Sequence, residues 1–493
     1  MRALISVYDK EGVADFARGL ADLGWELVAS SGTAVHLEAN GVGVTRIETL
    51  TGFGEILGHR VVTLHPAVHA GILARREVPS DVVDLEELGV EPFDLVCVGL
   101  YPFEQHETVE MIDVGGPSML RGAAKNYEHV AAVCRPDRYD AVLDELRRNG
   151  SLSVETRREL AAEAFATTAA YEAAIAAWFR RDESFPERAT FSLPKVADLA
   201  YGENPHQRAA FYGRAASIGD QLHGKPLSFN NLNDLAAARS LLDDLTGPAC
   251  AIVKHANPCG AAVAASIQAA YAGALASDPV SAYGGVVALD QRVDAALAGQ
   301  IADQFVEVLS APGYEPEALA VLAAKPAIRI LAAAPEPPAG GLDVRSALGG
   351  FLVQTRDSGL DDRAAMQVVC GELDDACWAD LLFAWTVCRH VTSNAIVLAK
   401  EERTIGIGAG QMSRVDAVQL AVDKACDHGH DLTGAALASD AFFPFADGPA
   451  IALEAGVRAI VQPGGSKRDD EVIQAVRESG AAMVFTGRRH FRH

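Results

Sequence analysis

Short apolar runs alternate with amphipathic stretches along the first third of the chain. The runs at residues 3–8, 25–30, 95–100 and 130–134 are bounded by turn residues, and residues 11–23 have the apolar spacing of a helix. Buried strands that alternate with helices are typical of a mostly parallel sheet that is covered on both faces. The pattern therefore predicts an α/β fold with parallel strands in this region.

A charged segment that carries proline separates this region from a second one. Residues 154–181 are rich in alanine, glutamate and arginine at helical spacing, whereas residues 182–198 show no periodicity. A chain of 493 residues exceeds what one hydrophobic core usually supports. We therefore expect an N-terminal domain of residues 1–185 and a C-terminal domain of residues 196–493.

The second region repeats the alternation of strands and helices and ends in a strand–helix–strand unit over residues 456–487. It contains no visible short repeat and no low-complexity tract. This alternation predicts α/β structure for the C-terminal domain as well. Its other strand-like runs lie at residues 249–253, 284–288, 395–400 and 434–438.

Composition and charge exclude several classes of protein. Apolar residues make up 49% and charged residues 22%, which is ordinary for a globular enzyme. The net charge of 42 − 66 = −24 argues against a nucleic-acid partner, because binding to phosphate backbones needs clustered lysine and arginine. It leaves room for a small anionic ligand, which needs only a few local cations.

Cysteine usage and hydropathy predict a cytoplasmic location. The eight cysteines are scattered without a CxxC pair, which favours reduced thiols over disulfides or a zinc site. The first residues run directly into a strand without a targeting pattern. Apolar stretches are interrupted too often to span a bilayer, so we expect no membrane partner.

Three uncommon strings near the end of the chain point to one ligand class. Thr404–Arg414 supplies glycines where a backbone could approach a ligand, Ser439–Phe445 places an acid beside aromatic rings, and Arg488–His493 is cationic. A cationic chain end is more often tied to the fold than frayed. Together they predict a site for a flat, anionic molecule.

Two segments of the N-terminal domain could hold a phosphate. Ser31-Gly32-Thr33 follows a strand and precedes a helical stretch, where free N–H groups and the helix dipole attract anions. Asp113–Pro117 and the cations that follow, up to Lys125, have a similar arrangement. For Ser31-Gly32-Thr33 a plain turn with a helix cap is the favoured interpretation, whereas for Asp113–Pro117 a structural turn and an anion site are balanced. His65 and His69 flank Pro66, and we expect a loop there without a metal.

Polar groups at predicted strand ends suggest catalytic chemistry in the second domain. Lys254 and His255 follow an apolar strand, where open α/β sheets bind ligands, and a turn is expected at residues 257–260. Histidine can transfer protons near neutral pH, and a neighbouring lysine can hold an anion. Asn394 and Asp440 stand at the ends of two further strands and could orient an amine and a carboxamide.

Taken together, these strings resemble one family along the whole chain. GIGAGQMSR, ASDAFFPF, VKHANPCG and YGENPHQ are similar to segments of the bifunctional purine-biosynthesis proteins that join AICAR (aminoimidazole carboxamide ribotide) transformylase to IMP cyclohydrolase. The resemblance implies formyl transfer from 10-formyltetrahydrofolate to the 5-amino group of AICAR, followed by ring closure with loss of water. It also implies a homodimer and a possible K⁺ in the second domain.

The resemblance implies a fold and a set of site residues. It implies an N-terminal parallel-sheet domain similar to methylglyoxal synthase and C-terminal cytidine-deaminase-like α/β units without zinc. No H-x-E…P-C-x-x-C signature of zinc deaminases occurs in the sequence. The implied catalytic residues are Lys254, His255, Asn394, Asp440, Lys125, Tyr101 and Asp113, and the implied substrate-binding residues are Ser31, Gly32, Thr33, Tyr201, Arg414, Phe442, Phe443, Arg489 and His493.

Several positions depart from the family pattern. Val62 stands where the family has a lysine in the cyclohydrolase pocket, and the other departures are Gly99, Tyr127, Ala200 and Thr392. Loss of one charge-assisted contact costs about 1.5–3 kcal/mol. Three hypotheses follow: the housekeeping enzyme with both activities, a paralogue that acts on an analogous aminocarboxamide C-ribotide of a nucleoside antibiotic pathway, or a non-catalytic nucleotide-binding protein.

Overall fold

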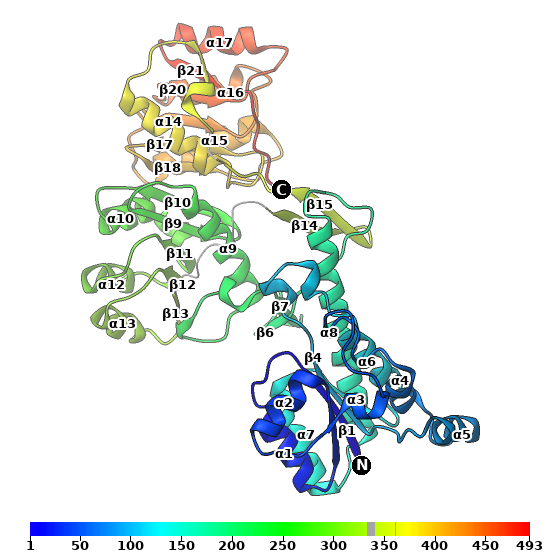
Figure 1. Ribbon diagram of the computed structural model, residues 1–493. Helices are drawn as coiled ribbons and strands as arrows, with labels where there is room; N and C mark the ends of the chain where they lie inside the picture. The colour runs from blue at the N-terminus through cyan, green and yellow to red at the C-terminus, as the bar shows by residue number, and fades with distance from the viewer. Residues whose placement is uncertain (333–340, 360) are drawn as a thin grey trace. The chain divides into compact units, whose positions relative to one another are not determined.

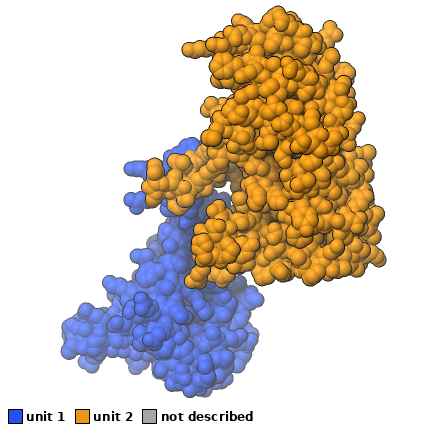
Figure 2. All heavy atoms as spheres, turned by 180° about the vertical axis from the view of Figure 1, so that it is seen from behind, with its two compact units in different colours: residues 1–193 blue, residues 194–493 orange. Residues whose placement is uncertain are grey.

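The protein is described by a computed structural model that covers residues 1–332, 341–359 and 361–493. The chain forms two compact units, unit 1 (Met1–Leu193) and unit 2 (Pro194–His493) (Figure 2). Each unit has its own sheet and core. No helix within the described ranges is both long and apolar enough to cross a membrane.

Unit 1 is built on a five-stranded sheet with the order β3-β2-β1-β4-β5, in which every neighbouring pair is parallel. Its strands are β1 (Arg2–Val7), β2 (Glu26–Ala29), β3 (Thr45–Arg46), β4 (Leu95–Gly99) and β5 (Ala131–Val133). Its helices are α1 (Val13–Asp22), α2 (Ser31–Ala39), α3 (Ile47–Thr51), α4 (Pro66–Leu73), α5 (Pro79–Leu88), α6 (Gly115–Lys125), α7 (Tyr139–Asn149) and α8 (Val154–Phe179), with short 3₁₀ turns at Phe103–Gln105, Val109–Met111 and Pro136–Arg138.

Helices bury both faces of this sheet. Successive side chains of a strand point to opposite faces, so Ile5 packs in one core with Phe16 of α1, while Leu4 packs in another with Leu120 of α6. The apolar runs lack polar alternation for this reason. Parallel strands that are covered on both faces leave their carboxyl ends as the place where loops can form a site.

Unit 2 contains a twelve-stranded mixed sheet (Figure 1). Its order is β16-β21-β20-β19-β17-β18-β10-β9-β11-β12-β13-β8. These strands are β8 (Gln221–His223), β9 (Ala249–Lys254), β10 (Asn257–Val263), β11 (Gly285–Leu289), β12 (Val306–Ala311), β13 (Arg329–Ala332), β16 (Gln367–Cys370), β17 (Ile396–Lys400), β18 (Arg403–Gly408), β19 (Ala436–Ser439), β20 (Ala459–Gln462) and β21 (Ala482–Phe485). The helices are α9 (Phe229–Asp243), α10 (Ile267–Ser277), α11 (Pro279–Ala282), α12 (Ala295–Ala302), α13 (Pro316–Ala323), α14 (Asp375–Cys388), α15 (Arg414–Asp427), α16 (Asp447–Glu454) and α17 (Asp469–Glu478).

The two halves of this sheet have the same topology. In each half an antiparallel hairpin is followed by parallel strands, and the halves meet where β10 pairs with β18. Each hairpin turns through two residues with positive φ: His255 (56°) and Ala256 (59°), then Glu401 (54°) and Glu402 (51°). Both turns are of the type that matches strand twist. The duplication is therefore structural, although no sequence repeat reveals it.

Glycines in the two halves explain how helices approach the sheet closely. A Cβ at Gly260 of β10 would lie 1.9 Å from Ala274 O, and one at Gly406 of β18 would lie 2.2 Å from Ala421 O. Neither position can carry a side chain without moving helix backbone. Gly406 of the GIGAG string is therefore needed for the close packing of α15 against β18.

Two small sheets lie outside the large one in unit 2. Strands β6 (Lys195–Leu199) and β7 (Ala209–Tyr212) form one, and β14 (Leu342–Ala347) with β15 (Gly350–Thr355) form an antiparallel hairpin (Figure 1). The hairpin leaves large apolar side chains in solvent, because Phe351 and Leu352 are each 66% exposed. Isolated two-stranded hairpins are rarely stable without a packing partner.

The predicted fold class is confirmed, whereas two local predictions are wrong. Both regions are α/β, and the N-terminal sheet is parallel as expected. The loop expected around His65 and His69 is helix α4 from Pro66 onward, with His65 as its N-cap, because proline is favoured in the first turn of a helix.

The second wrong prediction concerns the turn at residues 257–260. This segment is instead part of β10, and His255 and Ala256 make the turn. Pro258 is accommodated because the pairing of β9 with β10 is irregular between Pro258 and Gly260.

Candidate active sites

Unit 1 contains a cavity of about 620 Å³ at the carboxyl ends of three parallel strands. Val7 of β1, Ser30 after β2 and Gly99 of β4 line its floor. Of the residues suggested by sequence, it brings together Ser31, Gly32, Thr33, Tyr101 and Asp113. This is where open α/β sheets place their ligands.

The first turn of α2 offers free backbone donors to this cavity. Ser30 precedes the helix, but its hydroxyl donates to Ser6 Oγ (2.9 Å) and makes no capping bond. The N–H groups of Ser31, Gly32 and Thr33 donate to no group within the described residues. The Thr33 hydroxyl instead donates to Val7 O (3.2 Å), which fixes the helix on β1. A helix start with unused N–H groups is suited to an anion.

Lys10 is a cation in this cavity that the sequence analysis missed. Its Nζ donates to Tyr8 O (3.2 Å) and lies 3.4 Å from Thr33 Oγ1, so it borders the α2 turn. Burial lowers the pKa of Lys10, and the nearby Asp9 opposes this effect. Its position at the carboxyl end of the first predicted strand was the available signal.

Asp113 is held at the start of α6 by its own helix. Its Oδ1 accepts from Gly116 N (2.8 Å), and its backbone N–H donates to Tyr171 Oη (2.8 Å). A Cβ at Gly116 would lie 2.3 Å from Asp113 Oδ2, so any larger residue there would displace the Asp113 carboxylate. Burial raises the pKa of Asp113. Burial, followed by the charge of Asp113, also raises the pKa of Tyr101.

Lys125 lies at the other end of α6. The 11 residues of this helix correspond to roughly 15 Å. Lys125 is exposed and lines a different, shallow hollow of about 800 Å³ with Arg121 and Arg158. The structure therefore does not bring Lys125 to Tyr101 and Asp113.

Two of the family departures lie in the cavity itself. Val62 and Gly99 line it, whereas Tyr127 lines the hollow beside Lys125. A Cβ at Gly99 would meet Val7 Cβ at 3.3 Å, a contact that needs only a small shift. The cavity therefore has no polar side chain at these two positions, where the resemblance led us to expect one.

A buried polar cluster in unit 2 joins three strand ends. Asp440 follows β19 and is 0% exposed. Its carboxylate accepts from the Arg414 guanidinium and from the Ser393 hydroxyl. Arg414 also donates to Asn394 Oδ1 (2.8 Å) and Ser439 Oγ (2.8 Å). The structure thus brings together Asn394, Arg414 and Asp440 as the sequence suggested, with Ser393 as an added member.

Asn394 is fixed from both sides. Its Nδ2 donates to Gln411 O (2.9 Å) and Met412 O (3.2 Å), and its Oδ1 accepts from Arg414. The peptide bond between Ser393 and Asn394 is cis. The hydrogen bonds to Gln411 and Met412, which belong to the GAGQM loop, hold the side-chain amide of Asn394 in one orientation.

Lys254 and His255 lie at the tip of the first hairpin. The backbone N–H groups of His255 and Ala256 donate to the Asp234 carboxylate of α9 (3.2 and 2.7 Å). Lys254 Nζ donates to Tyr283 O (2.7 Å), and the His255 side chain is exposed. Burial raises the pKa of Asp234. The turn is thus held rigid by α9 while its histidine stays accessible.

A cavity of about 370 Å³ begins at this tip. It is lined by Lys254, His255, Lys424 and Asp278, among others. Asn257 connects the tip to the buried cluster, because its Oδ1 accepts from Thr392 N (2.9 Å) next to Ser393. The sequence analysis did not single out Lys424, Asp278 or Asn257.

The remaining suggested residues are not joined to the cluster by side-chain hydrogen bonds among the described residues. Phe443 is 1% exposed and belongs to the core, whereas Phe442 is 41% exposed. Arg489 and His493 are exposed, and Arg489 lies 4.5 Å over the Phe491 ring. Tyr201 is half-buried, and its carbonyl accepts from the N–H of the first residue of α9 (3.1 Å).

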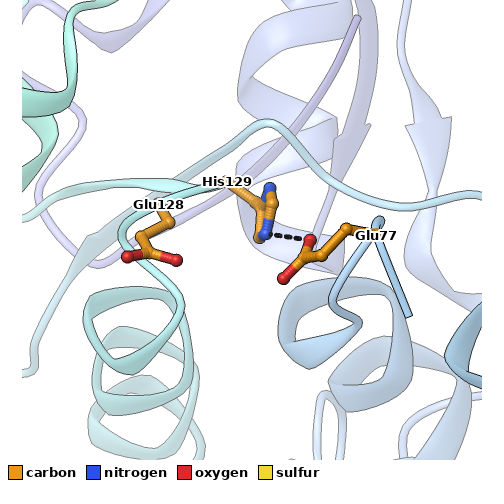
Figure 3. A group of neighbouring side chains, drawn as sticks. All are labelled: Glu77, Glu128 and His129. Carbon is orange, nitrogen blue, oxygen red and sulfur yellow. Dashed lines mark ion pairs between the residues drawn. The ribbon is translucent and has the colours of Figure 1, made fainter.

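One group of metal-capable side chains comes together in the described part of unit 1. Ligand atoms of Glu77, Glu128 and His129 lie within 4.8 Å of one another (Figure 3). His129 Nε2 already lies 2.8 Å from Glu77 Oε2, and both glutamates are exposed. An ordinary ion pair accounts for this group, and none of its members lines either cavity.

Comparisons with known proteins agree with this arrangement. Residues 12–118 match the MGS-like domain, and residues 123–424 match the AICARFT/IMPCHase bienzyme model. The bifunctional purine biosynthesis protein PurH of Cereibacter sphaeroides (strain ATCC 17025 / ATH 2.4.3) is 49% identical, over 100% of this chain and 98% of that protein. PurH of Acidithiobacillus ferrooxidans is 47% identical, over 100% and 99%.

A solved structure also matches, over a shorter stretch. The crystal structure of ForH is 43% identical, covers 36% of this chain and 98% of its own, and has a TM-score of 0.34. The family model and the full-length relatives settle the classification. The chain belongs to the AICARFT/IMPCHase bienzyme family and is a purine-biosynthesis enzyme that formylates AICAR and closes the product to IMP.

Proposed function

We propose that the two activities are divided between the two units. Unit 2 transfers the formyl group of 10-formyltetrahydrofolate to the 5-amino group of AICAR, and unit 1 closes formyl-AICAR to IMP. Each of the two structural units is then also a catalytic domain. The distribution of polar groups supports this division, because each unit has one cavity where strand ends present titratable side chains.

In unit 2 the difficult step is making the amine nucleophilic. The amine of AICAR is conjugated with its carboxamide, so it must lose a proton as it attacks the formyl carbon. His255 is exposed at the hairpin tip and takes that proton, while the ammonium of Lys254 stabilises the oxyanion of the tetrahedral intermediate. Collapse of the intermediate breaks the C–N10 bond and releases tetrahydrofolate, whose nitrogen regains a proton.

The buried cluster of unit 2 orients the substrate for the transfer. Asn394 already accepts from Arg414 and donates to Gln411 O and Met412 O, so a substrate amide would use the second lone pair of its Oδ1. Asp440 neutralises Arg414 and keeps its guanidinium in place. Orientation of the reacting groups is worth several kcal/mol in such transfers, on the order of 7–11 at the upper limit.

In unit 1, one set of groups binds the substrate and another set carries out the chemistry. The free N–H groups of Ser31, Gly32 and Thr33, with Lys10, bind the ribotide phosphate. Asp113 accepts a proton from the carboxamide nitrogen as that nitrogen attacks the formyl carbon, and the Tyr101 hydroxyl donates to the developing oxyanion. Loss of water from the cyclic intermediate then gives the purine ring.

We also propose that the protein is a homodimer. The β14–β15 hairpin exposes Phe351, Leu352 and Leu348, which is 106% exposed, on an isolated two-stranded sheet. Such a surface is marginal in water unless another surface covers it. A second copy of the chain is the partner that the family resemblance implies, and sedimentation of the F351E variant as a monomer tests it.

The suggested K⁺ does not fit the residues at the buried cluster. Both oxygens of the Asp440 carboxylate already accept, one from Arg414 and one from Ser393. The charge of the Asp440 carboxylate is therefore already balanced by Arg414, which weakens its attraction for a second cation. No step is assigned to a bound cation.

The proposal for unit 2 rests on one observation. His255 is exposed at a hairpin tip that α9 holds in place, and it lines the same cavity as Lys254. The test is formyl transfer measured with AICAR and 10-formyltetrahydrofolate for the wild type and for H255A. A loss of about 100-fold or more in kcat is expected from removal of the base. Wild-type activity in H255A would defeat the assignment.

The departures in the unit 1 cavity support a second candidate function. Val62 and Gly99 line this cavity without offering a polar side chain, which is the one observation that favours a paralogue acting on an analogous aminocarboxamide ribotide. Supplying formyl-AICAR and following IMP separately distinguishes the two. Full ring closure supports the housekeeping enzyme, and absent closure with intact formyl transfer supports the paralogue.

A further inference from the structure

The last residues of the chain run beside the buried cluster of unit 2. The carbonyl of Arg492 accepts from Ser393 N (2.8 Å), and the N–H of His490 donates to Asp440 O (3.0 Å). Arg492 in turn donates through Nη1 to His390 O (2.6 Å). The tail backbone is thus hydrogen-bonded to both residues whose side chains bond each other within the cluster.

His490 is the one buried residue in the tail segment 487–493, all of which the structure describes. Its side chain is 2% exposed and lies between two carboxylates. Nδ1 lies 2.6 Å from Asp357 Oδ2, and Nε2 lies 2.8 Å from Asp361 Oδ2. Both ring nitrogens therefore have a hydrogen-bonding partner, and the ring is fixed at both ends.

The second of these carboxylates is itself immobilised. Asp361 Oδ2 also accepts from Trp385 Nε1 (2.6 Å), and Arg488 Nη1 lies 3.2 Å from Asp361 Oδ1. Burial works against its charge, but the hydrogen bonds from His490 and Trp385 outweigh it and lower the pKa of Asp361. The imidazole therefore lies between two carboxylates of the segment before α14, and one of them, Asp361, is also held by Trp385 of α14.

We propose that His490 is a positioning residue for formyl transfer. Its clamp between Asp357 and Asp361 fixes the tail backbone, which fixes Ser393 and Asp440, and these fix Arg414 and Asn394. The inference rests on the proposed role of this cluster. The neighbours of His490 in the chain, Arg489 and Phe491, are exposed. His490 is therefore the side chain that attaches this part of the tail to the fold.

Positioning by this route predicts a specific kinetic signature. A shift of the cluster by a fraction of an ångström to 1 Å changes kcat for formyl transfer by about 10- to 100-fold. Ring closure in unit 1 does not use the tail, so its kcat stays within about twofold. Because the two activities reside on one chain, ring closure reports the concentration of chain with a folded unit 1 in each preparation.

The experiment compares H490A with H430A in the full-length chain. His430 is a half-buried histidine of the same unit, and its Nε2 contacts the carbonyls of Ala276 (2.9 Å) and Ser277 (3.4 Å), neither of which belongs to the cluster. The expected result is a loss of about 10- to 100-fold in formyl-transfer kcat for H490A relative to H430A, with unchanged ring closure. H490Q, which keeps one donor, should recover part of the rate.

A double-mutant cycle separates positioning from general destabilisation. H490A and S393A should have strongly non-additive effects on kcat, because both act on the same backbone segment. A kcat for H490A that matches H430A, or additive effects with S393A, would overturn the inference. Absence of formyl transfer in the wild type would instead defeat the proposed function, so the two failures are distinguishable.

Discussion

Arg414 and Asp440 form an ion pair in the interior of unit 2, with side-chain exposures of 9% and 0%. Two charges this deeply buried are costly to remove from water, and the cost is recovered only when both partners stay together. The Ser393, Ser439 and Asn394 side chains complete the hydrogen bonding of the pair. The pair therefore links the fold of this unit to the geometry of its proposed site.

Breaking this pair from one side should destabilise unit 2 strongly. R414M leaves the Asp440 carboxylate buried without its cation, and a loss of about 3–5 kcal/mol is expected. The double variant R414M/D440L removes both charges, and should be more stable than R414M alone while remaining inactive in formyl transfer. Calorimetric unfolding measures both effects, and a double variant that is less stable than R414M would contradict the account.

Ring closure should lose its rate on the acid side through Asp113. Burial raises the pKa of this carboxyl, so as the pH falls its base form is lost earlier than that of an exposed aspartate. The rate should fall about tenfold per pH unit below that pKa, and D113N should remove this limb together with most of the activity. The pH profile of IMP formation from supplied formyl-AICAR is the measurement. An acid limb that survives in D113N would show that another group is the base.

Nucleotide binding in unit 1 should weaken on the alkaline side through Lys10. Burial lowers the pKa of its ammonium, so the cation is lost at a lower pH than that of an exposed lysine. Affinity for IMP should decrease as the pH rises through that value, and K10M should bind weakly at every pH. Titration calorimetry with IMP tests this, with formyl transfer in unit 2 as the unaffected control. Equal alkaline weakening in K10M would exclude Lys10 as the cause.

Gly116 should be intolerant of the smallest possible side chain. A Cβ there would lie 2.3 Å from Asp113 Oδ2, whereas a Cβ at Gly54 would meet nothing within 4 Å. G116A should therefore displace the Asp113 carboxylate and reduce ring closure by about 10-fold or more, while G54A should not. Steady-state kinetics of both variants decide this, and an active G116A would mean that the carboxylate position is not critical.

Much of the fold could be predicted because it depends on local patterns. The runs at residues 95–100 and 249–253 are strands because both sheet faces are buried, which removes polar alternation from the sequence. The helix at 154–181 was visible from composition and spacing. The turn at His255 and Ala256 was missed because Asn-Pro-Cys-Gly has the stronger turn composition, yet an irregular pairing absorbs its proline into β10.

The sequence predicted which side chains come together in unit 2 only where they flank a strand. Asn394 and Asp440 meet there, but Lys125 was assigned to the cyclohydrolase site from a motif that spans a whole helix, and its end lies at another hollow. Phe443 could not be recognised as a core residue because its packing depends on distant segments. The contact of His490 with Asp357 joins positions 133 residues apart, which no local pattern encodes.

The assignment of one reaction to each unit is tested most directly by mixing two variants that each lack one of the two activities. H255A should convert supplied formyl-AICAR to IMP but not formylate AICAR, and D113N should convert AICAR to formyl-AICAR and stop. A mixture of the two, given AICAR and 10-formyltetrahydrofolate, should produce IMP after formyl-AICAR accumulates in solution. If either variant loses both activities while still folded, or if the mixture forms no IMP, the two reactions are not carried by separate sites as proposed.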